Sequence, residues 1–261
     1  MTIHPTAIVE NGAQLGDDVD IGPYCIVGAN VSIGDGSRLH SHVTIAGRTS
    51  IGPGAIIHPF VSLGGPPQHL GYKGEDTALQ IGANVIIREH TTMNIGTADG
   101  GGVTRIGDNG MFMTGAHVAH DCVVADNVIF ANNATLGGHV RIAENVFIGG
   151  MAAIHQHCRI GANAFVGGCA AVSGDVIPFG SAFGNHARLM GLNIIGLKRR
   201  GLSRKAIHEL RAGYRMLFEG EGAFRERLPA VRDAFGENVD VAAILDFIEE
   251  DGARSIMGPA R

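Results

Sequence analysis

The chain has 261 residues, of which 45% are hydrophobic and 17% are charged, and its formal net charge at pH 7 is −5. The hydrophobic residues are mostly Ile, Val, Leu and Ala, which excludes a disordered chain, and glycine does not occupy every third position, which excludes collagen. The negative charge gives no reason to expect nucleic acid or an anionic membrane as a partner. The length allows one large domain or two modest ones.

The N-terminal segment MTIHPTAIVENG has neither the charged nor the apolar region of a signal peptide. The sequence also contains no run of 18 apolar residues that could span a membrane. Its cysteines form no CxxC pair, so we expect buried free thiols in a reducing compartment at Cys25, Cys122, Cys158 and Cys169. We therefore expect a cytoplasmic protein.

Apolar residues recur at every sixth position over most of the first 185 residues. The run is Ile3, Val9, Leu15, Ile21, Val27, Ile33, Leu39, Ile45, Ile51, Ile57 and Leu63, then Ile81, Ile87 and Met93, and then Ile106, Phe112, Val118, Val124, Phe130, Leu136, Ile142, Ile148, Ile154, Ile160, Val166 and Val172. A period of six fits neither a helix nor a simple strand, but it fits a solenoid of short strands and bends. Three strands per coil of eighteen residues predict a mainly β protein, a parallel β-helix over residues 1–185. Small residues two positions before the apolar ones, such as Cys25 and Ala55, are expected inside the coil.

Two insertions interrupt the period, near residues 64–80 and 94–105. Long loops in an otherwise regular solenoid are usually functional, the alternative being tolerated surface insertions. The second insertion contains GGG at 100–102, which we discount as a phosphate loop because no GK[ST] follows.

The composition changes near residue 185, and helical spacing replaces the period of six. Ser203 is a plausible helix N-cap, and Ile207, Leu210, Tyr214 and Leu217 follow at helical intervals. AFRERLPAVRDAFG (223–236) and VAAILDFIEED (241–251) predict two further helices. Residues 186–261 are thus expected to form a small α-helical domain whose first part is basic.

The eighteen-residue coil predicts which residues stack on one another. Residues n and n+18 should lie one strand spacing apart, so His120, Gly138 and Gln156 form one column and Asp121, His139 and His157 form the next. His117 and His155 should share the same edge. A lone histidine there would be read as solvated, but this group offers a base, an orienting carboxylate and a backbone N–H for an oxyanion, which are the parts of an acyl-transfer site without a protein nucleophile.

Five segments carry a resemblance to a known family: AHVAHDC (116–122), ANNATLGGHV (131–140), GGMAAIHQHC (149–158), GNHA (184–187) and NIIGLKRRGLSR (193–204). Together they resemble the UDP-N-acetylglucosamine O-acyltransferases of lipid A synthesis, over nearly the whole chain. The resemblance implies a left-handed β-helix and a homotrimer with active sites between subunits. It also implies transfer of a 3-hydroxyacyl chain from the phosphopantetheine thioester of acyl carrier protein to the 3-position of a UDP-sugar, without a metal or other cofactor.

The resemblance implies a role for each matching residue. His120 would be the general base, Asp121 its partner and the Gly138 amide the oxyanion donor. The remaining matches would bind substrate, with His117, His139, His155 and Gln156 in the cleft, Asn193 and Arg200 at the nucleotide, and Arg199 at the phosphopantetheine arm. Nearby basic residues would dock the acidic carrier protein. Gly168 would leave room at the end of the acyl groove, so we expect a chain of roughly twelve to fourteen carbons.

The sequence departs from the family pattern in the first insertion. After Gln68 the family usually has an Asp-x-Lys pair, whereas this chain has His69 and Gly71, with Lys73 two positions further on. A lysine beside a protonated 3-amino group would repel it. Its absence therefore suggests the 3-amino analogue, UDP-2-acetamido-3-amino-2,3-dideoxyglucose, as the acceptor, and the alternative is neutral drift in a loop. A second departure, Ile195 in place of an acidic residue, puts one nucleotide contact in doubt.

Two other classes of function remain open from the sequence. A zinc hydratase of the γ-carbonic-anhydrase kind shares the solenoid and would bind zinc through three histidines. A non-catalytic structural solenoid would need no His-Asp edge. Cys122 follows the His-Asp pair, but it occupies the inward small-residue position and is expected to be inert.

Overall fold

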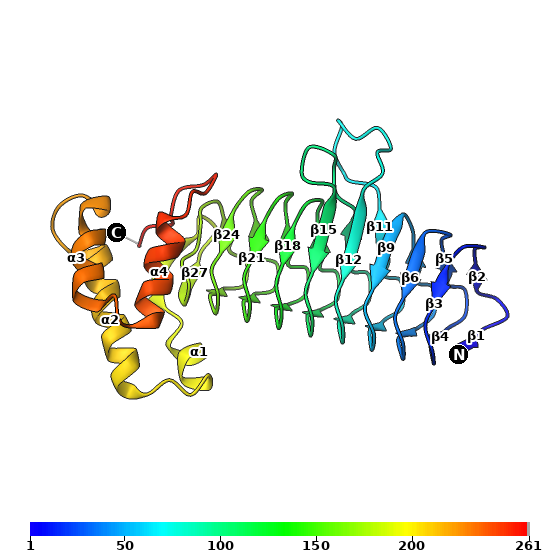
Figure 1. Cartoon of the computed structure of the whole chain (residues 1–261), viewed down its shortest axis with the longest axis horizontal. Coiled ribbons are helices and arrows are strands. Elements are labelled where there is room, and N and C mark those ends of the chain that lie inside the picture. The colour runs from blue at the N-terminus through cyan, green and yellow to red at the C-terminus, as the bar shows by residue number, and fades with distance from the viewer. Residues whose placement is uncertain (260–261) are drawn as a thin grey trace.

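The computed structural model describes residues 1–259, which form a long parallel β-solenoid followed by a group of helices (Figure 1). Each coil contributes one strand to each of three sheets, named here A, B and C, and nearly every strand pairs in parallel with the strands one coil away. The chain turns at three corners, the A–B, B–C and C–A corners, named by the sheets they join. The predicted solenoid with three strands per coil is confirmed.

The strands of the solenoid are short, mostly of two residues. Sheet A contains β1 (Thr2–Ile3), β4 (Asp20–Ile21), β7 (Arg38–Leu39), β10 (Ile56–Ile57), β13 (Ile86–Ile87), β16 (Met111–Phe112), β19 (Ile129–Phe130), β22 (Phe147–Ile148), β25 (Phe165–Val166), β27 (Gly180–Phe183) and β28 (Arg188–Leu192). Sheet B contains β2 (Ile8–Val9), β5 (Ile26–Val27), β8 (Thr44–Ile45), β11 (Ser62–Gly65), β14 (Thr92–Asn94), β17 (His117–Val118), β20 (Thr135–Leu136), β23 (Ala153–Ile154) and β26 (Ala171–Val172). Sheet C contains β3 (Gln14–Leu15), β6 (Val31–Ile33), β9 (Arg48–Ile51), β12 (Ala78–Ile81), β15 (Val103–Ile106), β18 (Val123–Val124), β21 (Arg141–Ile142) and β24 (Arg159–Ile160).

The apolar residues of the six-residue period fill the interior of the solenoid. Val27 pairs with Ile45 in the adjacent coil, and both are fully buried. The small residues expected beside them are all 0% exposed, namely Cys25, Ala55, Cys122, Ala134, Ala152 and Cys158. One large and one small apolar side chain per strand therefore fill a coil that is too narrow for two large ones.

Cys169 is exposed, so the expectation that all four thiols are buried was wrong for this residue. The other three cysteines stand two positions before an inward aliphatic residue, whereas Cys169 stands three positions before Val172. It therefore occupies the turn, with a φ of 57°, and its side chain points outward.

Both insertions leave the solenoid at the B–C corner. The first connects β11 to β12 and the second connects β14 to β15, and Figure 1 shows both loops projecting from the same side of the coil. Because of them, Ile51 pairs with Ile81, and Ile81 pairs with Ile106. The turn between β17 and β18, which carries His120, lies at this same corner.

The sheet continues beyond residue 185, where the sequence placed the end of the solenoid. Strands β27 and β28 form an antiparallel pair at the end of sheet A, so the regular coil gives way to helices only after Leu192. Between Leu192 and residue 259 the structure has the helices α1 (Ile194–Arg199), α2 (Arg204–Glu219), α3 (Phe224–Phe235) and α4 (Val239–Glu249). The short helix α1 was not predicted.

Helix α2 begins and packs as its sequence predicts. The Ser203 hydroxyl accepts a hydrogen bond from the Ala206 amide, which satisfies one of the free N–H groups of the first turn. The helix buries Ile207, Leu210, Gly213, Tyr214 and Leu217, chiefly against α3 and α4. No helix in the described part of the chain is long and apolar enough to cross a membrane.

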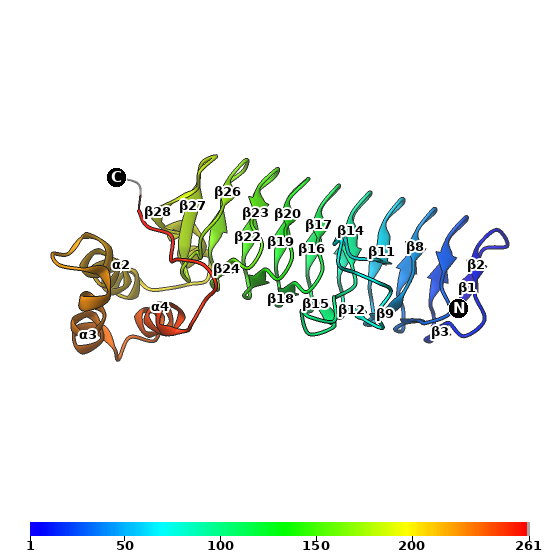
Figure 2. The ribbon, with the colours of Figure 1, turned by 90° about the horizontal axis from the view of Figure 1, so that it is seen from above.

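After α4 the chain returns to the last coil of the solenoid (Figure 2). The Asp175 amide donates to the Ser255 carbonyl, and Leu189 bonds the Gly258 carbonyl in the same way. This segment, residues 251–259, is called the C-terminal tail below.

Candidate active site

The turn after β17 holds a buried histidine–aspartate pair. Nδ1 of His120 lies 2.7 Å from Oδ2 of Asp121, and the Asp121 side chain is 0% exposed. Asp121 adopts a left-handed conformation with a φ of 60°, which aspartate tolerates better than most residues. Because an ionised carboxylate can only accept, Nδ1 carries the proton and Nε2 of His120 is left with a lone pair.

The second insertion holds the Asp121 carboxylate in its ionised form. Burial alone would raise the pKa of Asp121, but hydrogen bonds from the Thr97 hydroxyl (2.6 Å) and the Thr97 amide (2.8 Å), together with His120, outweigh it and lower the pKa. A Cβ on Gly100 would collide with the same carboxylate, so the glycine run lets this loop close over Asp121. The Thr104 hydroxyl accepts from the Asp121 amide at 2.8 Å. Sequence reasoning missed both threonines. The one sequence feature that pointed to them as site residues was their position in the second insertion.

Gly138 lies directly over His120 in the next coil. The His139 amide donates to the His120 carbonyl at 3.0 Å, and the His157 amide donates to the Gly138 carbonyl at the same distance. The predicted stacking of positions 120, 138 and 156 is therefore present. A Cβ on Gly138 would lie 2.6 Å from Cε1 and 2.8 Å from Nε2 of His120, so only glycine leaves space for the ring. Among residues 1–259, no backbone group accepts a hydrogen bond from the Gly138 amide, which is free to donate to a ligand.

Other histidines surround the His120 ring. His139 meets it edge-on with ring centroids 5.1 Å apart, and His69 from the first insertion lies 5.4 Å away. His157 stacks on His139 at 4.5 Å, and the His117 ring contacts the Thr92 hydroxyl at 2.7 Å. Burial lowers the pKa values of His117 and His139. The Asp121 carboxylate raises the pKa of His139, but burial and the neighbouring imidazoles outweigh it, and His120 lowers the pKa of His117 further. These rings therefore favour the neutral form.

His155 and Gln156 lie at the B–C corner of the coil after the one that carries Gly138, where the C-terminal tail meets this corner. Arg254 donates from Nε to the Gln156 carbonyl (3.0 Å) and from Nη2 to Nδ1 of His155 (2.8 Å). Sequence reasoning missed Arg254, because no spacing rule connects a residue at the end of the chain to this coil.

Several predicted residues lie on other corners of the same chain. Gly168 follows β25 at the A–B corner and is exposed. Asn193 caps α1 through the Gly196 amide and donates to the Asn163 carbonyl at the C–A corner, and Arg200 lies 5.6 Å from the Phe179 ring centroid. Arg199 and Ile195 are exposed on α1. A single chain therefore does not bring these groups to His120.

The remaining predicted residues lie in the first insertion. Gln68, His69 and Gly71 are all exposed, and a Cβ on Gly71 would lie 2.8 Å from Cε1 of His69. The His69 ring thus occupies the space that a side chain at position 71 would need.

The corner offers no activated thiol. The Cys122 sulfhydryl lies inside the coil, 3.1 Å from the Gly137 carbonyl, and burial raises the pKa of Cys122 to about 12. The expectation of an inert thiol is supported. His120, Asp121 and His139 do cluster, with potential ligand atoms within 4.8 Å of one another. The Asp121 carboxylate, however, is already engaged by the Thr97 hydroxyl and amide and by the His120 ring.

Comparison with known proteins covers both parts of the chain. The family model described as UDP N-acetylglucosamine O-acyltransferase, domain 2, matches residues 175–257, and the bacterial transferase hexapeptide model matches residues 30–65 and 104–138. The solenoid repeats and the helical region are thus recognised independently.

Relatives that cover three quarters or more of the chain agree with these matches. The chain is 55% identical over 259 residues to acyl-[acyl-carrier-protein]–UDP-N-acetylglucosamine O-acyltransferase of Azorhizobium caulinodans, covering 99% of this chain and 96% of the relative, and 59% identical over 198 residues to the enzyme of that name from Caulobacter vibrioides, covering 76% and 75%. The crystal structure of UDP-N-acetylglucosamine O-acyltransferase from Moraxella catarrhalis superposes with a TM-score of 0.95 at 40% identity, covering 98% of this chain and 100% of that one.

These relatives confirm the expected left-handed parallel β-helix and do not favour the zinc-hydratase or structural-solenoid alternatives. Sequence, fold and relatives agree over nearly the full length of the chain. The chain belongs to the UDP-N-acetylglucosamine O-acyltransferase family.

Proposed function

We propose that this protein transfers a 3-hydroxyacyl chain from acyl carrier protein to the 3-position of a UDP-N-acetylglucosamine-type sugar nucleotide. The observation that carries the proposal is the His120–Asp121 pair beneath the Gly138 backbone. It supplies a base with a free lone pair, a buried anion to stabilise the imidazolium, and an unoccupied N–H donor. All three lie on one corner of a rigid solenoid, as an enzyme that positions two substrates requires.

The reaction proceeds directly between the two substrates in this proposal. Nε2 of His120 takes the proton from the acceptor at the sugar 3-position, and the acceptor atom attacks the thioester carbonyl carbon. The Gly138 amide donates to the oxyanion that forms. The carbon–sulfur bond then breaks, and the imidazolium returns its proton to the leaving thiol of the phosphopantetheine arm. No cysteine is needed as a nucleophile, consistent with the inward, deeply buried position of Cys122.

We propose that the active site is shared between copies of the chain in a homotrimer. The base lies on the B–C corner, the acyl-groove residue Gly168 on the A–B corner, and the α1 residues next to the C–A corner. Three corners of one prism point in different directions, so these groups can meet only across a subunit interface. His117, His139, His155 and Gln156 would line the cleft on one side, and Asn193, Arg199 and Arg200 would contact the nucleotide and the phosphopantetheine arm.

Acyl carrier protein is the proposed donor protein. Exposed basic residues cluster at the start of the helical region, at Lys198, Arg199, Arg200, Arg204 and Lys205. A basic patch of this kind steers an acidic partner and raises its association rate. Gly168 leaves the end of the proposed groove open, which suits a 3-hydroxyacyl chain of roughly twelve to fourteen carbons.

We further propose that the preferred acceptor carries an amine at the 3-position. His69 lies beside His120, and its ring fills the space next to Gly71, where the family pattern has lysine. The Lys73 amide donates to the Glu75 carboxylate at 2.9 Å, and this hydrogen bond, with a smaller effect of the Lys73 charge, lowers the pKa of Glu75, so the charge of Lys73 is partly offset within its own loop. Without a lysine at position 71, a protonated 3-amino group meets less repulsion as it approaches His120; it loses its extra proton to solvent and enters the reaction above as the neutral amine.

The experiment is an acylation assay with both sugar nucleotides and a panel of 3-hydroxyacyl carrier proteins, read by mass spectrometry. We expect an acylated UDP-sugar to form, at a higher rate with the 3-amino acceptor than with the 3-hydroxyl acceptor. Among the donors, we expect the highest rate with chains of roughly twelve to fourteen carbons, because the groove is open at its end. A preference for the 3-hydroxyl acceptor would overturn only the acceptor proposal. Failure to acylate either sugar, with the protein folded, would overturn the transferase function itself.

A further inference from the structure

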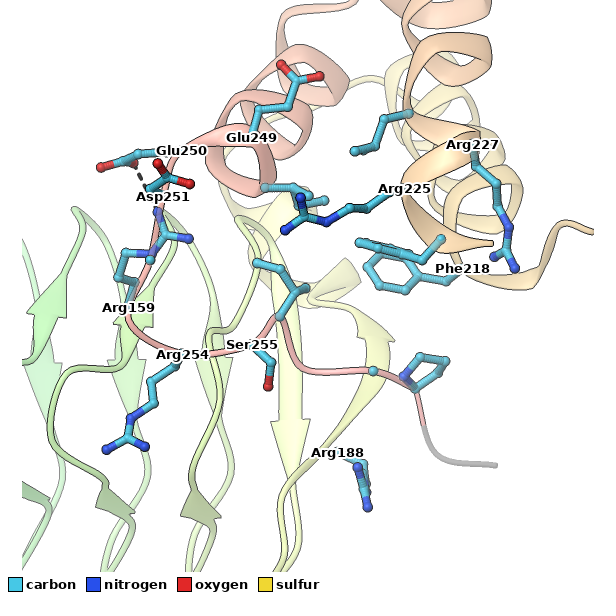
Figure 3. Close-up of a pocket in the computed structure, with 17 residues that line it drawn as sticks. Arg159, Arg188, Phe218, Arg225, Arg227, Glu249, Glu250, Asp251, Arg254 and Ser255 are labelled. Atoms are coloured by element: carbon cyan, nitrogen blue, oxygen red, sulfur yellow. Dashed lines mark ion pairs between the residues drawn. The ribbon is translucent and has the colours of Figure 1, made fainter. Parts of the chain in front are cut away.

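A cavity of about 1280 Å³ separates the helices from the end of the solenoid, and the C-terminal tail forms one of its walls (Figure 3). Several arginines line it. Arg225 lies on the helical side beside Phe218, whereas the Arg254 side chain extends over the last coils of the solenoid. Arg254 is therefore the lining arginine that also reaches the predicted active-site corner.

A buried ion pair fixes the path of the tail. Nε of Arg159 lies 2.7 Å from Oδ2 of Asp175, and the two side chains are 8% and 0% exposed. The Arg159 guanidinium also lies 4.4 Å from the Phe247 ring centroid on α4 and 3.2 Å from the Glu250 carboxylate. The backbone of Asp175 holds the tail directly, because it donates to Ser255 and accepts from Met257. Arg254 thus begins from a well-anchored backbone.

Nδ1 of His155 lies between two groups that require opposite protonation states. The Gln156 carbonyl oxygen, 3.2 Å away, can only accept a hydrogen bond, whereas Nη2 of Arg254, 2.8 Å away, can only donate one. Without Arg254, the carbonyl would favour a proton on Nδ1. With Arg254 present, the shorter contact requires a lone pair there, and the carbonyl instead accepts from Nε of Arg254.

We propose that Arg254 is a positioning residue that fixes His155 as the tautomer with its proton on Nε2. His155 then presents an N–H donor on the far side of its ring, and the substrate cleft receives a hydrogen-bond donor of fixed direction. The consequence for catalysis rests on the proposed function, in which His155 lines that cleft. The tautomer itself depends only on the contacts of Arg254.

The tautomer is measured by ¹⁵N NMR of ring-labelled histidine, with the His155 signals assigned by their loss in His155→Gln. We expect the wild-type protein to carry the proton on Nε2, and Arg254→Met to move it to Nδ1. Arg254→Lys keeps one donor and is expected to restore the wild-type tautomer in part. Arg225→Met is the matched control, because Arg225 lines the same cavity and its side chain has no hydrogen bond or ion pair with residues 1–259. This variant should leave the His155 signals unchanged.

Kinetics provide the second measurement. Loss of one directed hydrogen bond should raise KM for the substrate that contacts His155 by roughly fivefold to tenfold in Arg254→Met, with kcat changed less than about twofold. A wild-type His155 with its proton on Nδ1 would overturn the proposal, and this measurement needs no variant to fold. An Arg254→Met variant with wild-type tautomer and KM would also overturn it. Because the NMR result does not require turnover, it stands apart from failure of the transferase function.

Discussion

Nδ1 of His120 donates to Oδ2 of Asp121 at 2.7 Å, and the two residues are neighbours in the turn between β17 and β18. The Asp121 carboxylate accepts further hydrogen bonds from Thr97, which is supplied by a loop inserted into the preceding coil. The pair is therefore adjacent in sequence but depends on distant residues for its ionisation and orientation. A rigid coil combined with a loop closing over one corner places a charged pair where burial alone would oppose it.

Asp121→Asn should reduce kcat by about a hundredfold or more, because asparagine keeps one acceptor oxygen and turns an NH2 donor toward either the Thr97 amide or the other two donors, and the imidazole loses its orienting anion. Steady-state rates on the acyl carrier protein substrate check this, with circular dichroism to confirm folding. Asp99→Asn is the control, because Asp99 is an exposed aspartate of the same insertion with no hydrogen bond or ion pair to residues 1–259. If both variants kept wild-type rates, Asp121 would have no part in orienting the base.

Gly138→Ala should abolish most activity while leaving the solenoid folded. The new Cβ would lie 2.6 Å from Cε1 of His120 and would push the ring out of position. Gly28→Ala tests for a general effect of alanine at this corner, because a Cβ there would make ordinary contacts at 3.4 Å or more. Rates and melting temperatures of the two variants are compared. A fully active Gly138→Ala variant would show that the ring and this backbone do not form one site.

Acidification below neutrality should destabilise the protein partly through His117. Burial, and secondarily His120, hold the pKa of His117 below 6.5 in the folded state. As pH falls, the unfolded chain therefore binds this proton before the folded chain does. The free energy of unfolding is unaffected by His117 above about pH 6.5, and it decreases as pH falls from the pKa of His117 in the unfolded chain toward its lower pKa in the folded protein. Urea unfolding of wild type and His117→Gln between pH 7.5 and about 5, at one protein concentration, should show a shallower pH dependence for the variant. Equal slopes would contradict the stated pKa direction.

Subunit sharing can be tested by mixing inactive chains. Co-expression of His120→Ala chains with Arg200→Ala chains should restore activity, because some sites would combine an intact base from one copy with an intact arginine from another. Chains carrying His120→Ala and Asp121→Asn provide the control, since both changes affect the same corner and no such site can form. Activity of the purified mixtures is measured directly. If the first mixture recovered no more activity than the second, Arg200 would act on its own subunit or not at all.

The period of six predicted the coil and the column of His120, Gly138 and Gln156, because stacking in a regular solenoid follows from sequence spacing alone. The same arithmetic, applied strictly, places Cys169 outside the coil, since it stands one position too early to point inward. The period does not extend into the insertions or the tail. Thr97 and Arg254 reach the corner through irregular chain paths, which depend on tertiary contacts that no spacing rule gives, and Thr104 lies in β15, whose register is shifted by the second insertion.

The positions of Gly168 and Asn193 mark a second limit of sequence reasoning. Motif matching assigned them to the same site as His120, but one chain places them on other corners. In the proposed trimer these residues would meet His120 only through assembly, which the sequence of one chain encodes only through the surfaces it exposes.

The rate of UDP-sugar acylation by His120→Ala measures how far the reaction depends on His120 as its general base. Removal of the proposed general base should lower the rate by roughly a hundredfold to ten-thousandfold, with unchanged circular dichroism and melting temperature. A folded His120→Ala variant that acylates the sugar nucleotide at close to the wild-type rate would show that His120 is not the general base.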